Sequence, residues 1–224
     1  MSCFSEARLK PYLQACNGDF KKAFELYEWN IDLGAELLKD IAVFEVGLRN
    51  AYDRTMANVW QGDFHWLLDR DSPVNTPILR KRRDKTIDAN ALNRQAINEA
   101  SRKAKSAPSP NAVVSNLTLG FWSHLTDKAH ERDLWIPYLH KAWPEGTNRS
   151  DLNEKICSIN KCRNRISHHE KLFDTSAIIN PSVVDRNIEE LFSLLYPQQT
   201  LFDGEGPSRI DAFLIEHPFP ARDR

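Results

Sequence analysis

The chain of 224 residues has few glycines, few cysteines and no long apolar run. Only eight glycines are present, which argues against a glycine-rich nucleotide-binding fold. The four cysteines (Cys3, Cys16, Cys157 and Cys162) are unevenly spaced and no secretory signal is recognisable, which indicates reduced thiols in a cytoplasmic protein. The longest stretch without an acidic or basic residue, 106–126, contains two prolines, so we expect no membrane-spanning helix.

A large excess of charge is also missing. The chain has 30 Lys or Arg and 31 Asp or Glu, so a nucleic acid would have to be bound by a local basic face. Residues 80–105 carry nine basic against three acidic residues, a local charge of +6. Such a run is commonly a solvated helix face, but it could also bind a phosphate backbone in a salt-sensitive way. The candidate RNA-binding residues are Arg80, Lys81, Arg82, Arg83 and Lys85.

Apolar residues recur mostly at helical spacing, in a composition that is 41% hydrophobic and 27% charged. We expect helices at 5–30 (two, broken at Asn17-Gly18, the second capped by Asp19), 35–60, 78–105, 113–125, 135–143, 151–167 (capped by Ser150) and 183–196. The aromatic residues Trp60, Phe64 and Trp66 are expected in the core. The fold class is therefore all-α, a helical bundle, with one domain over 1–197 and a poorly ordered, irregular C-terminal tail over 198–224.

One arginine lies on an apolar helix face. At about 100° per residue, Arg163 falls within roughly 20° of Leu152 and Ile156. Arginine is rarely buried without a partner, so this guanidinium requires one or serves a function. His168 would lie some 140° around an unbroken helix from Arg163. The two can share a site only if the helix ends near Ser167 or if a second chain completes the site.

Arginine and histidine together suit metal-free cleavage of RNA. A guanidinium binds phosphate, and an imidazole can take a proton from a 2′-hydroxyl or give one to the leaving oxygen. A structural alternative is a buried Arg163 paired with Glu45 or a carbonyl group. We expect no zinc site and no cofactor, because Cys157 and Cys162 are five positions apart on a helix and adjacent histidines diverge.

The motif Arg163-Asn164-x-x-x-His168 resembles the R-N-x-x-x-H motif of the HEPN superfamily, and the chain over roughly residues 8–195 resembles the Abi-like (abortive-infection) proteins of bacteria within it. Three further stretches fit that family: 17–30, from Asn17-Gly18-Asp19 to Tyr27-Glu28-Trp29-Asn30; Glu45-Val46-Gly47-Leu48-Arg49-Asn50; and Gly120-Phe121-Trp122. Four landmarks in order are much more specific than the short motif alone.

The resemblance implies a HEPN-type bundle, usually dimeric, and in many members a metal-independent endoribonuclease that leaves a 2′,3′-cyclic phosphate. Other members only bind RNA, so a non-catalytic RNA-binding or interaction module is the alternative. The implied partners are RNA, a second copy of the chain and an antitoxin or inhibitory protein. The implied site consists of His168 as general acid/base, Arg163 as phosphate clamp, Asn164 and Glu45 in support, and His169, Arg49 and Asn50 as possible members. Glu45 and Arg49 could instead form an ion pair on the helix shoulder.

Overall fold

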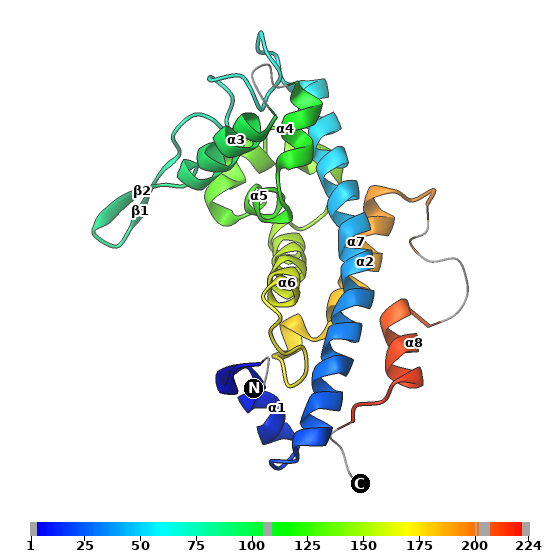
Figure 1. The fold of residues 1–224 in the computed structure, drawn as a ribbon. Helices are drawn as coiled ribbons and strands as arrows, with labels where there is room; N and C mark the ends of the chain where they lie inside the picture. Colours follow the sequence, from blue (N-terminus) through cyan, green and yellow to red (C-terminus); the bar gives the residue numbers. More distant parts are fainter. Residues whose placement is uncertain (1–3, 105–108, 200, 202–206, 221–224) are drawn as a thin grey trace.

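The fold is a bundle of helices around one long helix (Figure 1). The computed structural model describes residues 4–104, 109–199, 201 and 207–220. Its α-helices are α1 (Glu6–Ala15), α2 (Phe20–Val59), α3 (Ala91–Lys103), α4 (Pro110–Asn116), α5 (Leu119–His124), α6 (Arg149–Ser167), α7 (Pro181–Leu195) and α8 (Arg209–Glu216). The short 3₁₀ or π turns are η1 (Lys128–His130), η2 (Glu131–Trp135), η3 (Leu139–Ala142) and η4 (Ala177–Ile179). The expected all-α fold class is confirmed.

Helix α2 is longer than expected, because it joins two predicted helices into one of 40 residues. Asp19 caps it as predicted and accepts hydrogen bonds from the backbone N–H groups of Lys21 (2.9 Å) and Lys22 (3.1 Å). Gly34 does not break the helix. A Cβ built there would lie 3.4 Å from side-chain carbons of Ile166 and Leu172, so this glycine allows close packing of the end of α6.

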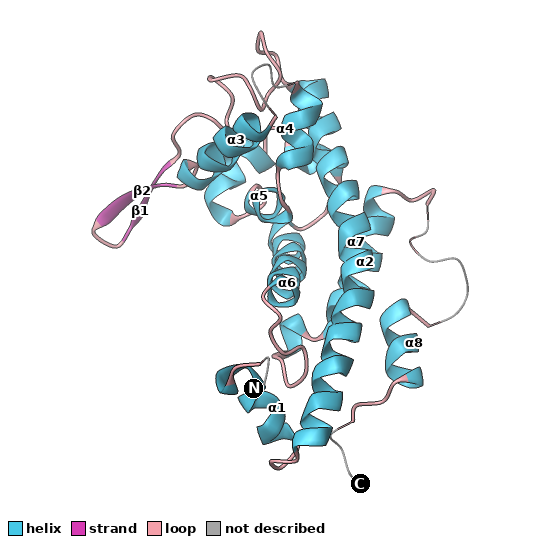
Figure 2. Ribbon diagram, viewed as in Figure 1, coloured by secondary structure: helices cyan, strands magenta, loops and turns pink. Residues whose placement is uncertain are grey.

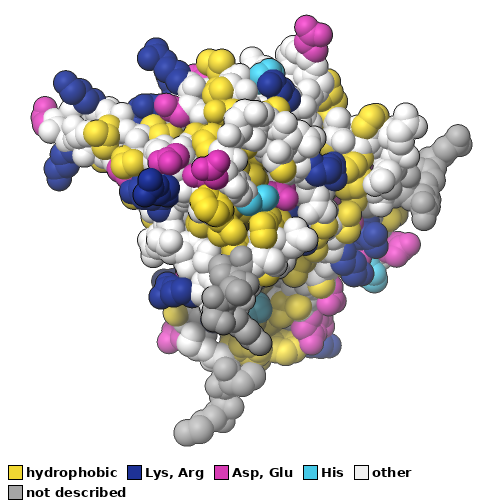
Figure 3. Space-filling model, turned by 90° about the horizontal axis from the view of Figure 1, so that it is seen from above, with side chains coloured by type: hydrophobic (Ala, Val, Ile, Leu, Met, Phe, Trp, Pro, Cys, Tyr) yellow, Lys and Arg dark blue, Asp and Glu magenta, His cyan; other side chains and the backbone are white. Residues whose placement is uncertain are grey.

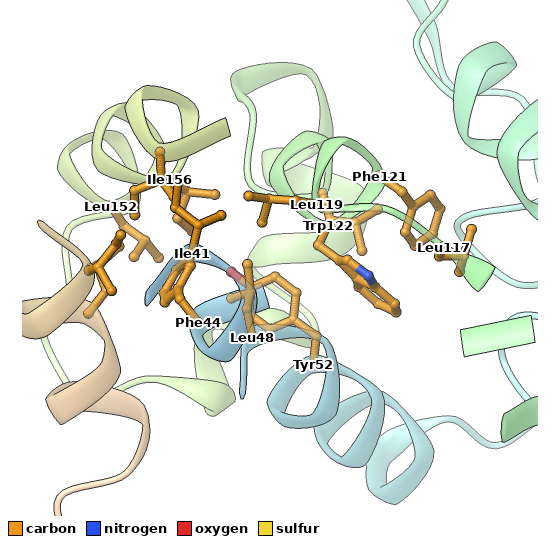
Figure 4. Packing of buried hydrophobic residues seen from close by; sticks show 14 of the residues in the cluster. Ile41, Phe44, Leu48, Tyr52, Leu117, Leu119, Phe121, Trp122, Leu152 and Ile156 are labelled. Atoms are coloured by element: carbon orange, nitrogen blue, oxygen red, sulfur yellow. The ribbon is translucent and has the colours of Figure 1, made fainter. Parts of the chain in front are cut away.

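The core lies between α2 and the helices around it. Ile41, Phe44, Leu48 and Tyr52 of α2 are fully buried. Figure 4 shows these side chains beside Leu119 and Trp122 of α5 and Leu152 and Ile156 of α6. The indole of Trp143 donates a hydrogen bond to the Tyr52 hydroxyl at 3.2 Å. The longest predicted apolar face is therefore the centre of the protein.

The predicted helix over 78–105 is wrong in its first half. Residues 79–88 form a β-hairpin that projects from the body, with β1 (Leu79–Arg82) antiparallel to β2 (Lys85–Asp88) (Figure 2). Asp88 closes its base by accepting hydrogen bonds from the N–H groups of Ile78 and Asn90, both at 3.0 Å. Short polar side chains that hydrogen-bond to nearby backbone groups compete with helix formation, and neighbouring like charges destabilise a helix. Helix α3 therefore begins only at Ala91.

Two smaller differences and one agreement concern helix ends. The helix expected over 113–125 is two, α4 and α5, separated by Leu117 and Thr118 in extended conformation. Helix α6 is capped by Asn148 instead of Ser150. Pro181 opens α7 as predicted. A cap is a local preference, and the neighbouring polar residue that reaches the free N–H groups decides it.

The expected irregular tail contains a helix. In α8, Ile210 is fully buried in the main core, and Arg209 Nε lies 3.2 Å from Asp40 Oδ1. The indole of Trp29 donates to the carbonyl oxygen of His217 at 2.8 Å. Residues 200, 202–206 and 221–224 of the predicted tail lie outside the described part. The sequence pattern did not predict this helix, because it is only eight residues long and lies among prolines and glycines.

Candidate functional site

The motif lies at the C-terminal end of α6, which ends at Ser167 as the sequence predicted. His168 is the C-cap, and the N–H groups of His169 and Glu170 bind the carbonyl oxygens of Ile166 (3.0 Å) and Arg165 (2.8 Å). This pair of bonds is the Schellman helix end, in which glycine usually takes the left-handed position. Here His169 takes it, with φ 53°. A left-handed histidine costs about 1 kcal/mol, so the surrounding structure must hold the turn.

A buried asparagine from α2 holds the turn after the motif. Asn30, only 4% exposed, donates to the Glu170 carbonyl oxygen at 3.2 Å and accepts from the Leu172 N–H at 2.6 Å. Sequence reasoning did not single out this residue as part of the site. A signal was present, because Asn30 falls on the same helix line as Leu26 and Leu37, where a polar residue requires a partner.

Two arginines secure the same turn through backbone carbonyl groups. Arg8 of α1 donates through Nη1 to the carbonyl oxygens of His168 (3.2 Å) and His169 (2.7 Å). Arg165 donates through Nε and Nη2 to the Lys171 carbonyl oxygen at 3.2 and 3.0 Å. Elements far apart in sequence therefore fix the backbone that carries both histidines.

Arg163 is half-buried and is not the paired core arginine of the structural alternative. Its Nη1 donates to Asn164 Oδ1 at 3.3 Å. Across the described ranges, no carboxylate lies within ion-pair distance of Arg163 or His168, and Asn164 and His168 are exposed. The guanidinium therefore keeps most of its donors available to a ligand.

Arg163 and His168 do not meet within one chain. Five positions separate them by about 7.5 Å along the helix axis and about 140° around it, since α6 stays helical through Ser167. No hydrogen bond between their side chains occurs in the described part of the structure. A single chain thus presents the two groups on different sides of the helix end.

The residues predicted on α2 lie beside another part of α6. The contacts of Gly34 with Ile166 and of Asn30 with Glu170 show that α2 and α6 run antiparallel. Glu45 is eleven residues beyond Gly34, which places it roughly 12 Å along the axis from the level of Arg163. Glu45 also forms no ion pair with Arg49 or Arg163 among the described residues.

Arg49 and Asn50 are likewise remote from the motif turn. Arg49 is half-buried, and its Nε is shielded from solvent without a hydrogen-bond partner. Asn50 is exposed. The shoulder ion pair that the spacing allowed for Glu45 and Arg49 is therefore not formed, and both charges are left without the partner that the sequence offered.

A basic hollow adjoins the motif turn. It has a volume of about 400 Å³, and its lining includes the cations Arg8, Arg165 and Lys171 together with His169 and Glu170. Arg165 Nη1 lies 3.5 Å from Glu170 Oε2, and the remaining cations leave the hollow with a net positive charge that favours an anion such as phosphate. His169 lines this hollow and His168 does not. His168 belongs to the motif and His169 lies beside the cations, so both histidines are candidates for proton transfer.

The basic hairpin lies near the opposite end of α6. Arg80 is engaged by its own chain, since its Nε and Nη2 donate to the Ala129 carbonyl oxygen (3.0 and 2.7 Å) and Nη2 also binds Asp133. Arg80 is thus held by its own chain, and its predicted contact with RNA stays a prediction. Lys81, Arg83 and Lys85 are exposed, and the side chain of Arg82 lies outside the described part.

Basic side chains are visible on the hairpin where it protrudes at the left of Figure 3. Arg149 is the first residue of α6, at the end of the helix nearer the hairpin. It donates to the Thr126 carbonyl oxygen at 2.8 Å and pairs with Glu131 at 3.1 Å. The 19 residues of α6 span roughly 27 Å between this end and the motif. An RNA that contacts both places must be at least that long.

One comparison with known proteins, that with family profiles, identifies a family for this chain. No curated protein and no solved structure shows a significant match to the chain. Of the helices in the described ranges, none has both the length and the apolar composition that crossing a bilayer requires. In the same ranges, no three His, Cys, Asp or Glu side chains are grouped so that they could hold a metal ion. The profile of the Abi-like proteins matches residues 3–174, well over half of the chain, and the protein therefore belongs to the Abi-like family.

Proposed function

We propose that this chain is a metal-independent endoribonuclease that acts in abortive infection, a form of phage defence. The observation that carries the proposal is that Arg163 and His168, at the end of α6, are not engaged by carboxylates of the described chain. The motif they belong to also resembles that of the HEPN superfamily. Neither side chain is committed to an ion pair within the described chain, so both are available to a ligand at the helix end.

The reaction requires only groups that the motif carries. A neutral imidazole of His168 removes the proton of a ribose 2′-hydroxyl, and the 2′-oxygen bonds to the adjacent phosphorus. The bond from phosphorus to the 5′-oxygen then breaks, and that oxygen takes the proton from the His168 imidazolium formed in the first step. The products are a 2′,3′-cyclic phosphate and a 5′-hydroxyl. Arg163, supported by Asn164, offsets the charge that develops on the phosphate oxygens.

A second copy of the chain would complete the site. An exposed apolar stripe runs along α2 and includes Ile31 (44% exposed), Leu38 (40%) and Val46 (42%). Arg49 lies on the line of Ile31, because 18 positions are five full helical turns. Gly34, within the same part of α2, contacts Ile166 of the motif helix. A copy packed on this stripe would therefore lie beside the motif.

The charges on the stripe favour a second copy over another partner. Glu45 and Arg49 are half-buried, and they do not pair with each other in the described structure. In a two-fold interface each contact occurs twice, so Glu45 of each copy can pair with Arg49 of the other. Such a dimer gives the α2 residues of the predicted site a role that one chain cannot provide.

Two basic features would hold the rest of the RNA. The hollow lined by Arg8, Arg165 and Lys171 suits a phosphate next to the cleaved one. Lys81, Arg83 and Lys85 on the hairpin suit the backbone farther along. A ribonuclease that attacks cellular RNA must be restrained, so an antitoxin or inhibitory partner belongs to the proposal.

A non-catalytic module that binds RNA or another protein is the second candidate. The observation that favours it is that Arg163 and His168 do not touch within one chain. In that case both residues would bind phosphate without transferring a proton. Cleavage separates the two candidates, because both of them predict RNA binding.

The test is cleavage of end-labelled RNA by the purified protein in excess chelator. We expect fragments with a 2′,3′-cyclic phosphate, and we expect His168→Ala to lower the rate by about 10²–10⁴-fold with an unchanged helical CD signal. His140→Ala is a matched control, because His140 is exposed and binds the Trp135 carbonyl oxygen away from the motif. His169→Ala shows which of the two adjacent histidines carries the proton.

Three results would contradict or redirect the proposal. Activity that depends on an added divalent cation would reject the mechanism. Equal rates for His168→Ala, His169→Ala and the unmodified protein would reject both histidines. RNA binding without cleavage would support the non-catalytic module.

A further inference from the structure

A second cavity, of opposite charge, lies where α2 ends. It has a volume of about 700 Å³, and its lining includes three aromatic side chains, those of Trp60, Phe64 and Tyr138. The rings of Trp60 and Tyr138 meet edge to face with centroids 6.3 Å apart. Phe64 was expected in the core, but it is 70% exposed. The Phe64 ring therefore lies in solvent at the rim of the cavity, where a bound molecule can reach it.

Trp60 is held in place by a buried carboxylate. Its Nε1 donates to Asp69 Oδ2 at 3.2 Å, and the N–H of Asp71 donates to Asp69 Oδ1 at 3.0 Å. Asp69 is only 5% exposed. The hydrogen bond from the Asp71 backbone, followed by that from Trp60, lowers the pKa of Asp69 despite its desolvation. These hydrogen bonds favour the carboxylate form of Asp69, which places a negative charge in the cavity wall.

Gly62 is tightly packed in the cavity wall. A Cβ at this position would lie 2.1 Å from Asp69 Oδ2 and 2.3 Å from Trp60 Nε1. Any side chain there would displace the Trp60–Asp69 hydrogen bond. The backbone of residue 62 thus packs against that bond, and Gly62 lines the cavity together with the aromatic side chains.

The charge of the lining selects the ligand. Asp63, Asp69 and Asp71 face a single cation, Arg70, which is highly exposed and only 3.7 Å from Asp71 through Nε. Carboxylates repel a phosphate backbone, so this cavity does not extend the RNA surface. Aromatic faces and carboxylates both attract an organic cation. A metal ion is disfavoured, because no three such side chains in the described chain are grouped as its ligands.

We propose that this cavity binds an organic cation that carries an alkylammonium or guanidinium group. Trp60, Tyr138 and Phe64 supply the aromatic faces, and Asp69 and Asp71 supply the charge. Two sources share this chemistry: a free polyamine, and a lysine or arginine side chain of a basic segment in a partner protein. The inference does not depend on nuclease activity, since the cavity lies apart from the motif.

The test is a titration of the full chain by calorimetry with choline and with its neutral isostere 3,3-dimethylbutan-1-ol. We expect saturable binding of choline that is at least fivefold tighter than binding of the isostere, because only the cation gains from the rings and carboxylates. Phe64→Ala should weaken choline binding by about fivefold or more. Phe20→Ala is the matched control, because Phe20 is 59% exposed and lies at the far end of α2.

Further arms identify the source and keep the inference falsifiable. A lysine-rich peptide acetylated only at its N-terminus keeps its side-chain ammonium groups. Tighter binding of spermidine than of this peptide would assign a polyamine, and the reverse order would assign a partner protein. Equal binding of choline and its isostere, equal loss in the Phe64→Ala and Phe20→Ala variants, or no saturable binding of any probe would overturn the proposal. His168→Ala should bind choline as the unmodified protein does, so this test and the nuclease test can fail separately.

Discussion

The two ends of helix α6 each lie near an arginine and a histidine, and the chain treats these residues differently. At the N-terminal end, Arg149 binds Glu131 and the Thr126 carbonyl oxygen. Nearby His130 is fully buried, with Nδ1 2.6 Å from Asp127 and Nε2 2.9 Å from Asn90. At the C-terminal end, Arg163 binds only its neighbour Asn164 within the described chain, and His168 is exposed.

This difference separates a structural cluster from a candidate site. Residue type alone does not distinguish the two ends, because both offer a guanidinium and an imidazole. The chain engages both members of one pair through hydrogen bonds, and burial makes such partners necessary. It leaves the other pair with free hydrogen-bonding capacity on a backbone turn that Asn30, Arg8 and Arg165 hold in place. A rigid turn with unsatisfied side chains is suited to a ligand.

The strongest way to break the comparison is to truncate the two arginines separately. Arg163→Ala should lower RNA cleavage by about 10²–10³-fold and change the free energy of unfolding by less than about 0.5 kcal/mol. Arg149→Ala should lower the free energy of unfolding by about 1–3 kcal/mol, because it leaves Glu131 and a carbonyl group without their donor. Urea denaturation and a cleavage assay on both variants measure this. Similar effects of the two changes would show that the ends of α6 do not differ in the proposed way.

A second test sharpens the comparison at the unengaged charges of α2. Glu45→Arg or Arg49→Glu alone should weaken the dimer by roughly tenfold or more, and the double change should restore it, because the charges pair across the two-fold axis. Sedimentation velocity over a concentration series measures the dissociation constant. Glu154→Arg, on the exposed face of α6, is the control. A chain that stays monomeric at every concentration would instead leave the stripe to another partner.

The smallest expected effect concerns a buried acid in the engaged part of the molecule. Burial raises the pKa of Asp40 from its usual 3.8 to about 6, Asp185 adds to this, and Arg209 opposes it. The folded state thus binds this proton more tightly than the unfolded state. The stability that Asp40 contributes is therefore fully present below pH 3.8 and is lost as the pH rises through 6. Relative to Asp40→Asn, the unmodified protein should gain about 1 kcal/mol of stability between pH 7 and pH 5.

Urea denaturation at the two pH values measures this difference. Asp32→Asn, an exposed position on the same helix, is the control. A pH dependence that Asp40→Asn leaves unchanged would show that Asp40 does not titrate in this range. The contrast between engaged and unengaged charges would then rest on the arginine and dimer tests.

The sequence predicted the parts of the fold that depend on neighbouring residues. The apolar face of α2, its cap at Asp19, the start of α7 at Pro181 and the end of α6 at Ser167 are confirmed. Each depends on side chains and backbone groups within a few positions, so spacing and residue type suffice. The family also followed from short motifs in their order along the chain.

Only the tertiary structure decided which predicted residues are available and what holds them. It placed Arg80 against Asp133, Asn30 against a turn 140 positions away, and a helix where the tail was expected irregular. It also made the first half of the predicted 78–105 helix a hairpin. These outcomes depend on which apolar faces pack together, because packing brings polar groups from distant segments within hydrogen-bond distance. No local spacing encodes that proximity.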